Sequence, residues 1–212
     1  MKNSKTALKF FALFIIAYAL FLSIWLLIKD PYNRAVTELS FALSTWKYDL
    51  HVKESSMHGR EMTFSVSNTT PMMGLKGIMK PFIIDISFDI ESVTFNIPMT
   101  LSLLTALIIT FGGSFREKMR LVAIGMGALF ALHVITLIVI SISLFAGTKG
   151  SSPMVHFYLN RFWMPLDLLE TLGMILNAYA ARFEPFLIAI LVWWQLQTYE
   201  IAEKKEEQLP HF

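Results

Sequence analysis

The stretch FFALFIIAYALFLSIWLLI, Phe10–Ile28, decides the fold of this chain, because it runs for nineteen residues without a charged side chain. A helix needs about 20 apolar residues to cross the roughly 30 Å hydrocarbon core of a bilayer. Lys2, Lys5 and Lys9 precede the stretch, as they would in a signal peptide, but a signal peptide has only about 7–15 apolar residues before a small-residue cleavage site. Here the stretch continues into LLIKDPYN. We therefore predict an uncleaved transmembrane anchor over residues 1–28.

The composition of the whole chain also points to a membrane protein. Of its 212 residues, 55% are hydrophobic and only 16% are charged, whereas a soluble domain usually carries about 25% charged residues. With this composition we expect the lipid bilayer among its partners. The net charge of +2 is too small for a nucleic-acid-binding surface, so we expect no nucleic acid among them. The chain has no cysteine, which excludes disulfide bridges, thiolate metal sites and cysteine nucleophiles.

Further apolar stretches predict three more spans, for a total of about four transmembrane helices. The second span, about 96–115, has a pair of glycines, Gly112 and Gly113, near its end. The third span, about 121–146, contains a single ionisable residue, His133. The fourth span, about 183–200, is the shortest, and we expect Glu184 to lie in the membrane interface at its start.

Positive charges near the spans set the predicted orientation. The positive-inside rule counts Lys and Arg in short loops, and they occur in the N-terminal segment and in REKMR, residues 116–120, which we expect to be a tight connection between two spans. Both segments then face the cytoplasm, as does the C-terminal tail 201–212. Residues 29–91 and the loop 147–182 face outward. Both termini of this multi-pass protein are therefore predicted to be cytoplasmic.

The outward segment 29–91 has the patterns of a small α+β module. After Pro31, apolar residues recur at helical spacing, which predicts a short amphipathic helix. Its expected apolar face consists of Val36, Leu39, Leu43 and Trp46. Three runs then alternate apolar and polar residues, as half-buried strands do: 47–53, 61–67 and 82–91. With turns at 55–59 and 68–77, they predict a three-stranded antiparallel meander with one apolar face.

The predicted fold class is therefore a mainly α membrane protein with about four transmembrane helices and an extracytoplasmic α+β insertion between the first two. The expected domains are the anchor 1–28, the module 29–91 and a transmembrane helical region 92–212. Within the last region a helix is expected over 165–181. Its apolar character leaves three possibilities, namely that it spans, re-enters or lies at the interface.

Six residues are candidates for function or partner contact. His133 lies in the middle of a span, which favours a functional role, and the alternative is a neutral imidazole hydrogen-bonded to a neighbouring helix. Asp167 and Glu170 share a helix face, which allows a carboxylate pair for acid–base or cation chemistry. The alternative is a polar interfacial face in which Arg182 pairs with an acid. The two remaining candidates, in the outward loop before this helix, are Arg161 and Trp163.

The sequence contains no glycine-rich phosphate loop and no Ser/His/Asp or HExxH spacing. We therefore predict no catalytic residue, no metal and no cofactor, and a protein that contacts partners rather than an enzyme. Two other functions stay open. One is a small transporter or ion-coupled membrane subunit that uses His133, Asp167 and Glu170, and the other is a membrane enzyme that uses the last two as a pair.

These features follow one another in a definite order along the chain. After the anchor and the outward module come the NIPMTLSLLTAL span, the REKMR segment, a span with a central His, the RFWMPL region and a span that opens with FEPFLIAILVW. This order resembles that of the exosortase H-associated membrane proteins, small bacterial inner-membrane proteins encoded beside an exosortase. The resemblance covers nearly the whole chain.

The resemblance implies a non-enzymatic accessory protein of the bacterial inner membrane in a protein-sorting system. Its partner would be an integral-membrane protein, the exosortase, or a sorted substrate with a C-terminal signal. An exosortase itself uses a set of Cys, Arg and His residues, so a chain without cysteine is not that enzyme.

Overall fold

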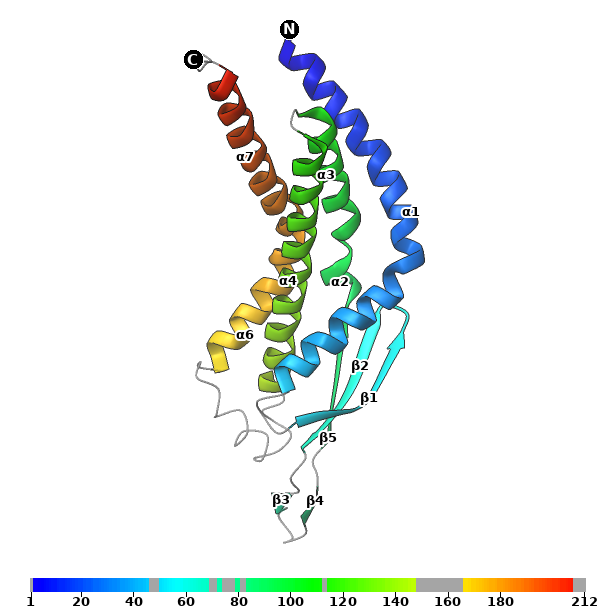
Figure 1. The fold of residues 1–212 in the computed structure, drawn as a ribbon. Coiled ribbons are helices and arrows are strands. Elements are labelled where there is room, and N and C mark those ends of the chain that lie inside the picture. The colour runs from blue at the N-terminus through cyan, green and yellow to red at the C-terminus, as the bar shows by residue number, and fades with distance from the viewer. Residues whose placement is uncertain are drawn as a thin grey trace. The chain divides into compact units, whose positions relative to one another are not determined.

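The computed structural model describes residues 2–45, 50–68, 72–73, 79–80, 83–111, 114–147 and 166–207. They belong to two compact units, each described by itself below. The first unit consists of Met1–Lys29, Asn96–Ala131 and Arg182–Phe212, and the second of Asp30–Phe95 and Leu132–Ala181. Two long helices contribute residues to both units (Figure 1): α1 (Lys2–Thr45) and α4 (Phe115–Gly147).

The first unit is made of helices. It contains the first part of α1, α3 (Ile97–Thr110), the first part of α4, and α7 (Ala181–Glu207). A glycine allows three of these helices to approach one another. At Gly125 of α4, an added Cβ would lie 3.0 Å from Leu104 Cδ1 of α3 and 3.3 Å from Ile188 Cγ2 of α7. Small residues at helix interfaces are typical of membrane helix packing.

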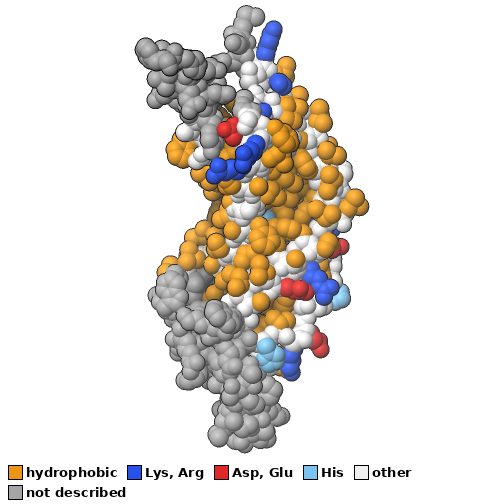
Figure 2. Space-filling model, in the orientation of Figure 1, with side chains coloured by type: hydrophobic (Ala, Val, Ile, Leu, Met, Phe, Trp, Pro, Cys, Tyr) orange, Lys and Arg blue, Asp and Glu red, His pale blue; other side chains and the backbone are white. Residues whose placement is uncertain are grey.

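Three helical stretches of the described chain are long and apolar enough to cross a membrane: Ser4–Thr45, Glu91–Thr110 and Phe115–Leu144. Large apolar side chains are exposed along them, among them Leu8, Ile16, Leu27 and Ile124. Figure 2 shows hydrophobic side chains over much of the visible helical surface. An apolar surface of this extent suits a bilayer rather than water, so the helices indicate a membrane protein. The fourth predicted span, in α7, is not among the three and stays a prediction.

The second unit contains a three-stranded antiparallel sheet with strand order β1-β2-β5. Its strands are β1 (Leu50–His58), β2 (Glu61–Asn68) and β5 (Ile83–Asp89). The predicted meander is therefore confirmed. A separate two-stranded pair, β3 (Met72–Met73) with β4 (Met79–Lys80), lies between β2 and β5 in the sequence.

One predicted turn of the meander is misplaced. The turn expected at 55–59 is not formed there, because β1 continues to His58 and the chain reverses at Gly59. Gly59 has a φ of 64°, a backbone conformation that glycine adopts without steric cost. The strand expected to begin at residue 47 is described from Leu50 onward, and residues 46–49 lie outside the described chain.

The apolar face of the sheet packs against α1. Phe41 of α1 stacks on Phe64 of β2, with ring centroids 3.9 Å apart and an interplanar angle of 13°. The alternate residues of β2 and β5 that were predicted to face the core are buried around this contact. They join residues of α1, α2 (Glu91–Thr94) and α4 in one core: Val36, Met62, Val66, Ile84, Ile86, Ile90, Val93, Val134, Leu137 and Ile140.

Two helix boundaries differ from the prediction. Pro31 does not start a new helix but lies inside α1, where its missing donor and the clash of its ring with the carbonyl four residues earlier weaken the helix without ending it. The segment 116–120 is not a tight connection, since α4 already begins at Phe115. Glu117 accepts hydrogen bonds from the backbone N of Ser114 (3.0 Å) and from its hydroxyl (2.8 Å), a capping box that starts the helix early.

The face of α1 that meets the sheet shares only Val36 with the predicted one among the described residues. Leu39 and Leu43 are exposed, and Trp46 lies outside the described residues. The buried polar residues on this part of the helix are Asn33, Thr37, Ser40, Ser44 and Thr45. The four hydroxyl groups among them donate to carbonyls one turn earlier in the same helix, as from Thr37 to Asn33 at 2.6 Å. Such bonds satisfy the hydroxyls internally, so the small polar face can be buried.

The helix predicted over 165–181 is helical in the structure. It consists of α6 (Leu166–Ile175) and a π-helical turn, Leu176–Ala180, that leads into α7. Gly173 of α6 lies directly against α4, because an added Cβ would be 2.5 Å from Cβ of Ser143. The packing of α6 on α4 thus requires a residue without a side chain at this position.

Gly173→Ala is therefore expected to destabilise the protein, because the added methyl group overlaps Ser143. Overpacking of this kind costs about 1–3 kcal/mol. The measurement is the thermal unfolding midpoint of the purified chain in detergent, followed by circular dichroism. Gly127→Ala is the control, since a Cβ there meets nothing within 4 Å. Ser143→Gly should restore part of the loss, and equal midpoints for the two alanine variants would contradict the close approach.

Candidate functional site

His133 of α4 is completely buried in the second unit. Its Nδ1 lies 2.8 Å from the hydroxyl oxygen of Tyr32 on α1. The two rings meet edge to face, with centroids 6.0 Å apart and an interplanar angle of 80°. A tyrosine hydroxyl can donate to the unprotonated nitrogen of a neutral imidazole. This is the geometry expected of a histidine bonded to a neighbouring helix, and a chemical role for His133 stays a prediction.

Asn33 and Thr94 are a second buried polar pair in the same unit. Asn33 follows Tyr32 in α1, and its Oδ1 accepts a hydrogen bond of 2.7 Å from Oγ1 of Thr94 in α2. Asn33 Nδ2 is a buried donor without a hydrogen-bond partner among the described residues. An unsatisfied buried donor of this kind costs about 1–3 kcal/mol. We call Tyr32, Asn33, Thr94 and His133 the Tyr32–His133 cluster.

A separate buried polar pair lies in the first unit. Glu184, in the first turn of α7, is only 2% exposed. Asn96, which precedes α3, donates from Nδ2 to Glu184 Oε2 at 2.6 Å. The amide of Asn96 makes burial of the carboxyl group possible, and the expectation that Glu184 lies at the depth of the membrane interface stays a prediction. The sequence reasoning missed this pair, although an acid directly before Pro185 at the start of an apolar stretch is a signal for it.

The other predicted site residues do not join these groups in the part of the chain that the structure describes. Arg182 is exposed in α7. Asp167 and Glu170 belong to α6, but their side chains are outside the described structure, so their predicted pairing is untested. Arg161 and Trp163 lie outside the described residues altogether. Within the described chain, no group of three or more His, Asp or Glu residues could hold a metal ion.

Tyr32→Phe is expected to lower the free energy of unfolding by about 1–2 kcal/mol, because His133 loses a hydrogen-bond donor in a buried setting. His133→Phe should have a cost of its own. The double variant should cost less than the sum, because each single change already removes the shared bond. Unfolding in detergent measures all three, with Tyr18→Phe in the same helix as the control. If the cost of the double variant equals the sum of the two single costs, the bond between Tyr32 and His133 does not stabilise the protein.

For the first unit, Asn96→Leu should lower the free energy of unfolding by about 2–3 kcal/mol, because it leaves the Glu184 carboxyl group buried without this donor. Glu184→Gln should cost much less, since the amide oxygen of glutamine can still accept from Asn96. Replacing both residues by leucine should recover part of the loss. A cost for Glu184→Gln as large as that for Asn96→Leu would argue against the observed bond as the main stabilising contact.

No protein-family model, curated protein or solved structure matches this chain. Its function therefore has to be inferred from its own residues. Those that the structure describes offer buried polar groups within apolar helices, and a sheet with one face turned away from the core.

Proposed function

We propose that this protein is a non-enzymatic accessory subunit of an exosortase-type protein-sorting system in the bacterial inner membrane. In this proposal four helices span the membrane, both termini are cytoplasmic, and the α+β module of residues 29–91 lies outside. The module docks the exosortase or one of its sorted substrates. The order of spans and motifs supports the identity of the partner, and the outer face of the sheet supports the docking role.

The outer face of the sheet is the observation that carries this proposal. Paired residues of antiparallel strands project to the same side of a sheet, and here they form three polar rows across β1, β2 and β5. The rows are Glu54–Ser65–Asp85, Ser56–Thr63–Ser87 and His58–Glu61–Asp89. Thr63 and Ser87 share a hydrogen bond of 2.7 Å, and the Ser65 hydroxyl donates to Asp85. The opposite face is buried, so this polar face is the one available to a partner.

These rows are acidic. They contain four carboxylates and one histidine: Glu54, Glu61, Asp85, Asp89 and His58. Glu61 and Asp89 are direct cross-strand partners, and like charges in that position destabilise a sheet. A positively charged partner surface would relieve this repulsion. The proposed partner therefore presents basic side chains to the sheet.

Two hydrogen bonds of Arg60 fix the turn between β1 and β2. Arg60, at the turn between β1 and β2, donates from Nε to Glu91 Oε2 at 2.8 Å, and its carbonyl accepts from the backbone N of Ile90 at 3.1 Å. The bond to Glu91, followed by the negative charges of Glu91 and Asp89, raises the pKa of the Arg60 guanidinium. With Phe41 packed on the other side, the outer face is preorganised, which lowers the entropic cost of binding.

Photocrosslinking in native membranes tests the docking role. A photoreactive residue at Ser87, on the outer face, is expected to give a discrete adduct with an integral-membrane protein or a sorted envelope protein. Leu27 is the control position, because it is 82% exposed on an apolar part of α1. Higher ionic strength should weaken the Ser87 adduct, since salt screens exposed charges. The same adduct from both positions would contradict docking by the sheet.

Charge reversal tests whether the acidic rows are responsible. Glu54→Lys and Asp85→Lys are each expected to reduce the yield of the Ser87 adduct several-fold, through repulsion of a basic partner. Glu38→Lys, at an exposed acid of α1, is the control with the same charge change. Unchanged yields in the sheet variants would contradict the acidic surface.

In cells, normal processing of C-terminal sorting signals after deletion of the gene would contradict the exosortase assignment.

A further inference from the structure

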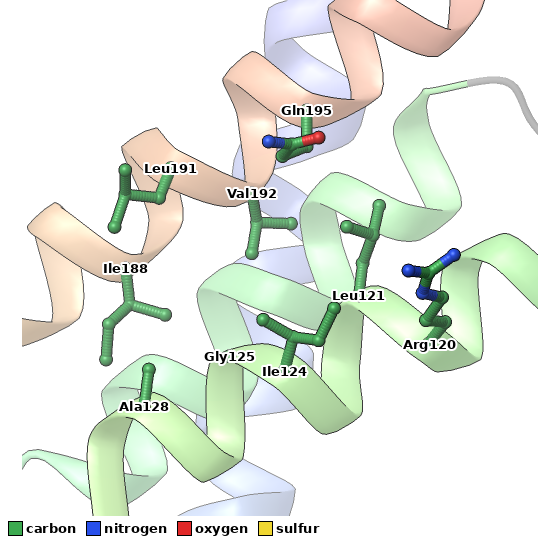
Figure 3. A pocket seen from close by; sticks show the side chains of 9 residues that line it. All are labelled: Arg120, Leu121, Ile124, Gly125, Ala128, Ile188, Leu191, Val192 and Gln195. Atoms are coloured by element: carbon green, nitrogen blue, oxygen red, sulfur yellow. The ribbon is translucent and has the colours of Figure 1, made fainter. Parts of the chain in front are cut away.

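A groove of about 350 Å³ lies between α4 and α7 in the first unit. Its floor consists of residues that are buried: Leu121 and Gly125 of α4 with Ile188 and Val192 of α7. Figure 3 shows the apolar side chains of α7 pointing toward α4, and Leu121 and Ile124 of α4 pointing toward α7. The volume is within the roughly 300–1,000 Å³ of small-molecule sites.

The groove is apolar along most of its length and polar at one end. The two helices run antiparallel along it, so that Arg120 lies at the same end as Gln195, and Ala128 at the same end as Ile188 (Figure 3). From Arg120 to Ala128 the groove follows α4 for about 12 Å, at 1.5 Å per residue. Arg120 is exposed at the polar end, and none of the nine lining residues is acidic. The site therefore combines an apolar slot with a positive charge at one end.

This combination matches the chemistry of a membrane lipid. We propose that the groove binds one anionic phospholipid of the surrounding bilayer. An acyl chain lies along Ile124, Ala128 and Leu191, and the phosphate is held by Arg120 with a hydrogen bond from the amide of Gln195. Arginine suits this role because its planar guanidinium donates two parallel hydrogen bonds to a phosphate. Basic pockets between membrane helices are known to hold anionic headgroups.

Two features favour an anionic lipid over a zwitterionic one. Among the lining residues that the structure describes, Arg120 alone is charged, so a headgroup without a compensating amine is preferred. In the preceding turn of α4, Arg116 and Lys118 outnumber the one acid, Glu117, and leave that turn with a net positive charge. This inference requires only that α4 and α7 lie in a bilayer, and it is independent of docking by the sheet.

Native mass spectrometry of the full chain in mild detergent tests the headgroup preference. The probes are phosphatidylglycerol and phosphatidylcholine with identical palmitoyl and oleoyl chains, added in equal amounts. We expect about fivefold more bound phosphatidylglycerol, which corresponds to roughly 1 kcal/mol for one arginine near an anionic group. Arg120→Gln should bring the ratio close to one. Arg116→Gln is the control, because it removes the same charge outside the groove and should lower the ratio much less than Arg120→Gln does.

A second pair of variants tests the apolar part of the groove. Leu191 and Ile190 are adjacent in α7 and equally exposed, at 57%, but only Leu191 lines the groove. Leu191→Trp fills the groove and should reduce binding of both lipids several-fold, whereas Ile190→Trp should not. Circular dichroism establishes that each variant is folded.

Three results would overturn the proposal. They are equal binding of the two lipids by the unaltered chain, equal effects of Arg116→Gln and Arg120→Gln, or equal effects of the two tryptophan variants. The second result would mean a diffuse basic surface instead of a groove site. None of them would change the expected adduct from Ser87, so failure of the lipid site and failure of the docking role can be distinguished.

Discussion

The contact of Phe41 with Phe64 is the interaction on which the second unit depends. The two rings are nearly parallel, with their centroids 3.9 Å apart. The ring centroid of Phe88 lies 6.2 Å from that of Phe41. A three-stranded sheet with one apolar face is not stable alone and has to be covered. The cover comes from α1, the same helix whose apolar surface suits a bilayer. The module is therefore no independent domain on a tether, because its core includes Val36 and Phe41 of α1 and also Val134, Leu137 and Ile140 of α4, and both helices contain candidate spans.

A second constraint acts on every polar group within these helices. In apolar surroundings a polar group has to find its partner inside the protein. The hydroxyls of α1 meet this requirement within their own helix, as Ser40 does with the carbonyl of Val36. His133 meets it with a residue of another helix, and so does Glu184. These polar residues are thus explained by their bonds before any chemistry is invoked, whereas Asn33 Nδ2 is an exception among the described residues.

The strands could be predicted from the sequence far better than the helix that covers them. In 84–90 the exposed residues are two aspartates and a serine, so the alternation with apolar residues is visible locally. In α1 the signal is reversed, because Leu39 and Leu43 face away from the core while Thr37 and Ser40 face it. Single exposed leucines are common on protein surfaces, and hydroxyls bonded to the carbonyls of their own helix cost little when buried. Hydrophobic periodicity therefore fails for a helix in this setting.

The candidate sites show a similar division. His133 could be found from the sequence, because an ionisable residue stands out in an apolar span, but its partner Tyr32 is 101 positions away and has no local signal. Asn96 and Glu184 are 88 positions apart. Such pairs also distinguish charged groups that are bonded inside the protein from charged groups that are exposed on its surface. Glu91 and Glu184 are already bonded within the protein, whereas Arg120 and the carboxylates of the outer sheet face are exposed. In a chain with so few charged residues, the exposed ones are where a lipid or a protein partner gains most by binding.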